Sequence, residues 1–202
     1  ARSSYGVDIP QAQRAPLIGR ERELDVLVDA LSRVRAEHSP QLVTLVGVPG
    51  IGKSRLVYEL SKVIENEAEL TSWRQGRSLP YGEGISFWAL GEMVKAQAGM
   101  LETDSTEEAA GKLARSVREL VDESEADWVA RHLGALVGLE SEQELKGDHR
   151  AEAFAAWRRF FEALAEERPL VLVFEDLHWA DEGLLDFVDH LVDWAGGVPI
   201  LV

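Results

Sequence analysis

Glycine, lysine and serine occur in residues 47–54 at the spacing of a phosphate-binding loop. The segment reads Gly47, Val48, Pro49, Gly50, Ile51, Gly52, Lys53 and Ser54, and it fits the pattern GxxxxGK(S/T) at every fixed position. The glycines allow successive backbone N–H groups to approach a polyphosphate closely. Lys53 can supply charge to the β- and γ-phosphates, and the Ser54 hydroxyl can join a magnesium shell. We therefore predict that the loop binds Mg²⁺ and a nucleoside triphosphate; the alternative is a strand-to-helix turn that binds nothing.

Two carboxylates, Glu175 and Asp176, directly follow an apolar run that is typical of a buried strand. In open parallel sheets, ligands gather at the carboxyl ends of the strands. One carboxylate there can hold Mg²⁺, and the other can orient or deprotonate an attacking water. Which of the two serves the metal stays open, and so does the simpler alternative that both acids cap the next helix. Together with the loop, the pair predicts a catalytic site for nucleotide hydrolysis.

The sequence also bears on which base the loop accepts. Guanine-specific P-loop proteins generally read the base with an NKxD segment, and Asn66, within Glu65-Asn66-Glu67, is the only asparagine in the chain. Because that segment cannot be built, adenine is favoured by exclusion. The predicted ligands are therefore ATP and ADP, with Mg²⁺ as the metal.

The elements that position these residues follow from the spacing of apolar residues. A helical period begins at Glu21 and ends near His38. A short β-branched run at 42–46 predicts a strand, buried on both faces, directly before the loop. The loop then opens into a predicted helix at 53–68, and a weaker strand is expected near 70–75.

The second half of the chain is mainly helical by the same criterion. Helical periodicity dominates about 80–167, where 105–108 has the form of a capping box. A strongly apolar strand at 170–174 carries the acidic pair at its end. A final helix is expected over about 181–195, and the apolar run 198–202 has the pattern of an unfinished strand.

This alternation predicts the fold class. Strands that alternate with helices indicate an α/β fold with a parallel sheet, because parallel neighbours need crossover connections. We expect a P-loop NTPase whose parallel β-sheet is flanked by helices, with a helical insertion at about 80–167 between strands two and three. Residues 1–16 resemble a linker, and 17–202 form the expected P-loop ATPase domain. Because the chain stops within an apolar run, we expect this domain to be C-terminally truncated, a fragment of a longer protein.

Composition narrows the possible partners and location. The chain has 21 Lys and Arg against 36 Asp and Glu, a formal charge of −15, so direct nucleic-acid binding is not expected. Cysteine is absent, which excludes disulfides and thiolate chemistry. No apolar run approaches the roughly 20 residues that span a bilayer, and no signal segment is evident. We therefore expect a cytoplasmic protein with no membrane partner.

Three stretches of the chain resemble the ATPase modules of the AAA-like, signal-transducing (STAND) class, which occur in bacterial multidomain regulators. They are 17–24, the phosphate loop with Arg55 and Leu56, and 170–181. The stretch 79–88 is similar to modules that are fused to class III nucleotide cyclases. Together these stretches span almost the whole chain.

The resemblance implies features that residue spacing alone does not. It implies an adenine pocket to which three residues contribute: Leu17, Ile18 and Gly19. The nucleotide-binding segment would extend to Arg55, and strand four would lie between the first and third strands. Residues that sense the γ-phosphate would lie beyond Val202. The acids of strand three are usually Asp then Glu, whereas here Glu175 precedes Asp176.

Three functions fit these observations. The leading hypothesis is a Mg-ATP module that acts as a nucleotide-dependent regulatory switch with slow hydrolysis. It would control an effector domain in the same longer chain, such as a cyclase, and self-assembly is an expected accompaniment. The main alternative is a non-hydrolysing interaction scaffold in which nucleotide is vestigial or structural. A P-loop kinase for a small metabolite ranks last, because the acidic segment and the insertion match regulators better.

Overall fold

The computed structural model describes residues 17–80, 87–139 and 149–202; the predicted linker at 1–16 and most of the stretch 79–88, namely 81–86, lie outside them. Within the described ranges, seven α-helices and a short 3-10 helix accompany three strands. In chain order these are α1 (Glu21–Glu37), α2 (Lys53–Asn66), β1 (Ser72–Arg77), α3 (Trp88–Ala98), α4 (Thr106–Leu120), α5 (Glu123–Leu136), α6 (His149–Glu167), β2 (Leu170–Glu175), η2 (Leu177–Trp179), α7 (Glu182–Trp194) and β3 (Ile200–Leu201). The α/β class is confirmed. None of the described helices is long and apolar enough to cross a membrane.

The three strands form one parallel sheet in the order β1-β2-β3. β1 and β2 pair along their whole length, and the pairing ends with Arg77 opposite Glu175. On the other side of β2 lies β3, to which Gln41 forms a parallel bridge at Leu201. β3 therefore lies between β2 and the segment that leads into the loop, which is the strand order that the resemblance implies.

The prediction of a doubly buried strand at 42–46 is wrong. Its hydrogen bonds to β3 stop at Val43, whose N–H donates to the Val202 carbonyl at 2.8 Å. Beyond this point, no strand lies beside the segment among the described residues. Alternate residues differ in burial: Val43 packs partly buried against the core, whereas Val46 is 89% exposed. The segment is extended backbone with one covered face, because α1 and α2 pack on one side of it only.

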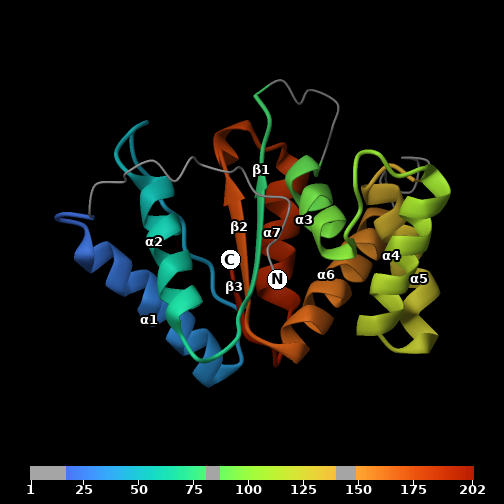
Figure 1. Ribbon diagram of the computed structural model, residues 1–202, viewed down its shortest axis with the longest axis horizontal. Helices are drawn as coiled ribbons and strands as arrows, with labels where there is room; N and C mark the ends of the chain where they lie inside the picture. The colour runs from blue at the N-terminus through green and yellow to red at the C-terminus, as the bar shows by residue number, and fades with distance from the viewer. Residues whose placement is uncertain (1–16, 81–86, 140–148) are drawn as a thin grey trace.

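The sheet separates two apolar cores. Figure 1 shows α1 and α2 on one side of the sheet, α3, α6 and α7 on the other, and α4 and α5 farthest from α1. Successive residues of β2 serve opposite cores: Val171 packs with α1 and α2, whereas Leu170 and Leu172 pack with the larger group of helices. The fold is thus a helix-sheet-helix sandwich in which α3–α6, which lie between β1 and β2 in the chain, extend one layer.

A buried aromatic cluster joins these helices to the rest of that layer. Trp157 of α6 is fully buried and lies 4.9 Å from Phe87 and 5.5 Å from Phe187 between ring centroids. Its indole N–H donates to the His132 carbonyl of α5 at 3.0 Å. One side chain therefore contacts the start of α3, α5 and α7, so the inserted helices and α7 pack as one unit.

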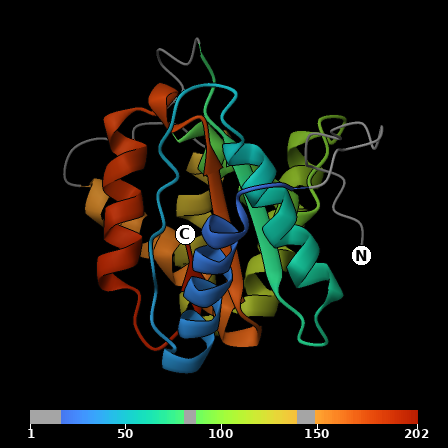
Figure 2. The same ribbon diagram turned by 90° about the vertical axis from the view of Figure 1, so that its left-hand side faces the viewer.

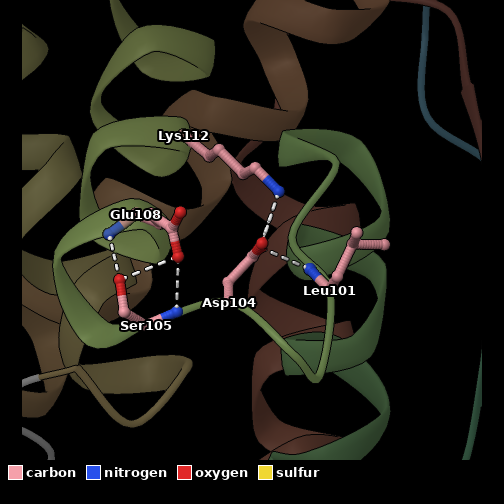
Figure 3. Close-up of polar contacts among 5 residues, drawn as sticks. All are labelled: Leu101, Asp104, Ser105, Glu108 and Lys112. Carbon is pink, nitrogen blue, oxygen red and sulfur yellow. Dashed lines mark hydrogen bonds and ion pairs between the residues drawn. The ribbon is translucent and has the colours of Figure 1, made fainter.

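The capping box predicted at 105–108 is confirmed (Figure 3). The Ser105 hydroxyl accepts from the Glu108 N–H at 3.2 Å, and the Glu108 carboxylate accepts from the Ser105 N–H at 2.8 Å. The Glu108 carboxylate also accepts from the Ser105 hydroxyl at 2.8 Å, and the hydrogen bonds from the Ser105 N–H and hydroxyl hold the pKa of Glu108 below its ordinary value. The two reciprocal bonds satisfy N–H groups that the first turn of a helix leaves unpaired, so the start of α4 is fixed locally.

Gly76 lets β1 and α3 come into direct backbone contact. A Cβ at this position would lie 2.1 Å from the Ala89 carbonyl oxygen and 2.8 Å from its carbon. Real atoms do not approach so closely, and backbone cannot move aside as a flexible side chain can. Glycine is therefore required one residue before Arg77, where β1 ends.

Replacing Gly76 by alanine should lower the free energy of unfolding by about 1–3 kcal/mol, because α3 must move off β1 to admit the methyl group. Urea denaturation measures the change. Gly111→Ala is the matched control: Gly111 lies within α4, a Cβ there meets nothing within 4 Å, and alanine should raise stability by up to about 1 kcal/mol. Equal stability of Gly76→Ala and the wild type would contradict the close contact.

Candidate functional site

The phosphate loop lies at the end of the sheet where β1 and β2 finish. Figures 1 and 2, two views at right angles, both place the loop before α2 at the same end as the carboxyl termini of these strands. The acidic pair directly follows the same end of β2. The two motifs, separated by more than a hundred residues in the sequence, therefore gather at one edge of the fold.

Two glycines give the loop a shape that other residues adopt at a cost. Gly50 has φ 80° and Gly52 has φ 107°, both in the left-handed region. Gly52 is also the N-cap of α2, and its carbonyl accepts from the N–H groups of Arg55 and Leu56 at 3.1 Å. The loop thus turns directly into the first turn of a helix.

The start of α2 carries no competing negative charge. Its N-cap, Gly52, has no side chain to bond the free N–H groups, and the first turn contains no acidic residue. By contrast, Asp181 caps α7, accepting from the Leu184 N–H at 3.1 Å, and Ser105 caps α4. A helix N-terminus that no side chain satisfies is suited to an anion, because its N–H groups and dipole both attract negative charge.

Lys53 brings a cation to the same place. Its Nζ donates to the Gly47 carbonyl at 2.8 Å and to the Val48 carbonyl at 3.3 Å, so the side chain bends back over the loop. Ser54 is exposed in the first turn of α2. Arg55 turns along the helix and pairs with Glu59 at 2.5 Å. The fit to a polyphosphate therefore rests on the backbone, Lys53 and Ser54.

An arginine holds the acidic pair. Nη2 of Arg77 lies 2.9 Å from the Glu175 carboxylate, and its Nε lies 3.4 Å from that of Asp176. Glu175 is the more enclosed acid, with 12% of its side chain exposed against 47% for Asp176. Asp176 also has a positive φ of 57°, so the chain turns sharply between the two. The carboxylates consequently face one shared cation from different backbone conformations.

Sequence spacing alone does not place Arg77 beside the acidic pair. Arg77 and Glu175 are 98 residues apart, and only the β1–β2 register sets them side by side. The alternative reading of the acids as caps of the next helix is wrong. Asp176 makes no side-chain cap to η2, and Asp181 caps α7. For Arg77, the clue in the sequence was an arginine two residues beyond the strand predicted near 70–75.

The expected adenine-pocket residues lie before α1. Leu17 packs partly buried against the α1–α2 core, and Ile18 is 78% exposed. Gly19 has φ 73°, and its N–H donates to the Glu21 carboxylate at 3.0 Å. These contacts order the approach to α1, while a role in binding adenine stays a prediction.

Comparison with known proteins assigns the chain to a family. Residues 16–202 match the family model described as the AAA ATPase domain. The chain belongs to the AAA ATPase domain family. An uncharacterized protein of Rhizobium meliloti (strain 1021) is 29% identical over 192 residues, which cover 93% of this chain and 18% of that protein. The chain therefore spans under a fifth of its relative. No solved structure matches significantly.

Membership of the AAA ATPase domain family makes the chain a P-loop NTPase domain and supports nucleotide binding. The family generally binds ATP with Mg²⁺, and the donors here suit that pair. Ser54, Glu175 and Asp176 carry oxygen atoms of the kind that Mg²⁺ prefers as ligands. Backbone N–H groups and an ammonium group, which suit phosphate, are supplied by the loop and Lys53.

Replacing Gly52 by alanine should lower the free energy of unfolding by about 1–2 kcal/mol, the cost of a left-handed conformation in a residue with a Cβ. A Cβ at Gly52 meets nothing within 4 Å, so the loss would come from φ alone. Urea denaturation of Gly52→Ala beside Gly111→Ala checks this, since the control has the opposite expected sign. A stabilised Gly52→Ala would contradict the loop conformation.

Proposed function

We propose that this AAA ATPase domain binds Mg-ATP and acts as a nucleotide-dependent regulatory switch with slow hydrolysis. The observation that carries the proposal is the start of α2. Its first N–H groups have no side-chain cap, its first turn has no acidic residue, and Lys53 adds an ammonium group there. This arrangement attracts a polyanion locally despite the net charge of the chain. ADP would occupy the same loop after hydrolysis.

Each residue of the proposed site has a distinct task. Lys53 would neutralise the β- and γ-phosphates, and backbone N–H groups of the loop would bind their oxygens. Ser54 and one strand-end carboxylate would hold Mg²⁺, which supplies charge neutralisation when bound. The other carboxylate would orient the attacking water. Glu175 and Asp176 share Arg77, so neither is assigned to one task by its contacts.

The choice of adenine and the proposal of a longer protein rest on other observations. Adenine is favoured because the guanine-reading segment is absent from the sequence, and Leu17, Ile18 and Gly19 would border it by resemblance to STAND modules. The relative is more than five times the length of the matched region, which supports a domain within a larger protein. An effector in the same chain, such as a cyclase, and self-assembly belong to this proposal.

A non-hydrolysing scaffold is the second candidate, and one observation favours it. Arg77 engages both carboxylates at once, so the groups needed for hydrolysis are already paired. A domain that keeps this pairing with nucleotide bound would hold ATP as a structural ligand. The two candidates share ATP binding and differ in turnover.

ATP binding should depend on Lys53. Calorimetric titration with Mg²⁺ should show ATP and ADP binding to the wild type, and Lys53→Ala should weaken ATP binding about tenfold to a hundredfold, the loss of a charged contact. Lys62→Ala is the control, because Lys62 lies on the same helix and pairs with Glu65. Equal ATP affinity of the Lys53 variant and wild type would refute the assigned pose, and equal affinity for GTP would refute adenine selectivity.

Turnover should separate the two carboxylates. Glu175→Gln and Asp176→Asn keep size while removing charge, so the variant of the metal ligand should weaken Mg²⁺-dependent ATP binding. The variant of the water-orienting group should bind ATP normally but release phosphate at least about a hundredfold more slowly. Phosphate release measured beside ATP binding distinguishes them. A wild type that binds ATP without releasing phosphate would favour the scaffold.

A further inference from the structure

A charged pocket lies among the helices that connect β1 to β2 in the chain. Its volume is about 200 Å³, and it is open to solvent and lined by α3, α4 and the last turn of α6. Its polar lining consists of Gln97, Lys112, Arg115, Ser116, Glu119 and Glu167. In Figure 1, these helices lie across the sheet from α2, so the pocket is separate from the phosphate loop.

One wall of the pocket is fixed by an ion pair. The Lys112 ammonium lies 2.7 Å from both oxygens of Asp104, which also accepts from the Leu101 N–H at 2.7 Å (Figure 3). These contacts, Lys112 first, hold the pKa of Asp104 below its ordinary value. Only 10% of the Asp104 side chain is exposed. Lys112 is therefore neutralised and held in place by the loop between α3 and α4.

The remaining charges of the pocket are not balanced in this way. Arg115 and Glu119, four residues apart on α4, form no ion pair in the part of the chain that the structure describes. The closest cation to Glu167 is Arg168, at 3.9 Å. Ser116, which lies between Arg115 and Glu119 on α4, is buried, with 8% of its surface exposed. The pocket thus presents Arg115 and Glu119 without ion-pair partners, beside Glu167, whose pairing with Arg168 is long.

A half-buried arginine contacts Gln97, one of the residues that line the pocket. Arg74 of β1 donates from Nη2 to the Gln97 side-chain oxygen and from Nη1 to the Trp73 carbonyl at 2.7 Å. No carboxylate pairs with it among the described residues, and its Nε is buried without a partner. Burial, and then the charge of Arg168, lower the pKa of Arg74. Gln97 is held by its oxygen, which leaves its amide N–H groups as donors for another molecule.

We propose that this pocket binds a small zwitterion of the free α-amino acid class. The ligand's carboxylate would meet Arg115 and the Gln97 amide, and its ammonium group would meet Glu119 and Glu167. The volume lies below the roughly 300–1,000 Å³ of pockets that take drug-sized ligands, so a nucleotide is too large. The inference does not rest on ATP binding, because it uses none of the residues of the loop.

Opposite charges in one small pocket also define what it rejects. A simple anion would meet Glu119 and Glu167, and a simple cation would meet Arg115. Like charges repel, so each half of the pocket disfavours ligands that lack the matching group. Only a molecule that carries both charges satisfies both halves.

The test is a calorimetric titration of the whole chain with four probes: L-alanine, L-serine, L-glutamine and L-glutamate, each up to about 10 mM. Each probe is matched by its N-acetyl derivative, which lacks the ammonium group, and by the amine that lacks the α-carboxylate. At least one free amino acid should bind saturably with one site per chain, and both of its derivatives should bind at least about tenfold more weakly.

Three variants locate the binding. Arg115→Gln and Glu119→Gln should each weaken binding of the amino acid about tenfold or more. Arg118→Gln, on the same helix but paired with Asp127 outside the pocket, should leave binding unchanged. All three sites are exposed, and circular dichroism verifies that each variant is folded. The proposal is overturned if no probe saturates, if the derivatives bind equally, or if Arg115→Gln and Arg118→Gln behave alike.

Discussion

Parallel pairing of β1 with β2 is the constraint on which the site depends. The register runs without a bulge to Arg77 opposite Glu175, so two strand ends finish together and their last side chains must meet. Because parallel strands carry their carboxyl ends to the same edge, that edge also receives the loop before α2 (Figure 2). The acidic pair, its arginine and the phosphate loop thus depend on one alignment of backbone hydrogen bonds.

The pairing of β1 is in turn supported by α3. Gly76 allows the backbone of α3 to touch β1, and the Arg74 side chain reaches Gln97 near the other end of the helix. α3 is then held by the aromatic cluster around Trp157, which also contacts α7. The inserted helices are therefore part of the structure that positions Arg77. The same packing forms the charged pocket beside Gln97.

Local charge, rather than net charge, decides what this acidic chain can bind. The formal charge is −15, yet the first turn of α2 has no acidic residue and Lys53 bends over it. Exposed charges farther away than about 10 Å are largely screened at ordinary ionic strength, whereas the helix N-terminus and Lys53 act at contact distance. A net charge that repels nucleic acid is therefore compatible with a polyphosphate site at this loop.

The sequence by itself determined the features that depend on neighbouring residues. Patterns within a few residues predict the loop motif, the helices, the apolar strand before Glu175 and the capping box at Ser105. The strand predicted near 70–75 lies at 72–77 in the structure, a displacement of only two residues. The tertiary structure alone decided that 42–46 has one covered face and that Arg77 holds both acids. Burial and pairing across 98 residues depend on which elements pack together, and no local spacing encodes that choice.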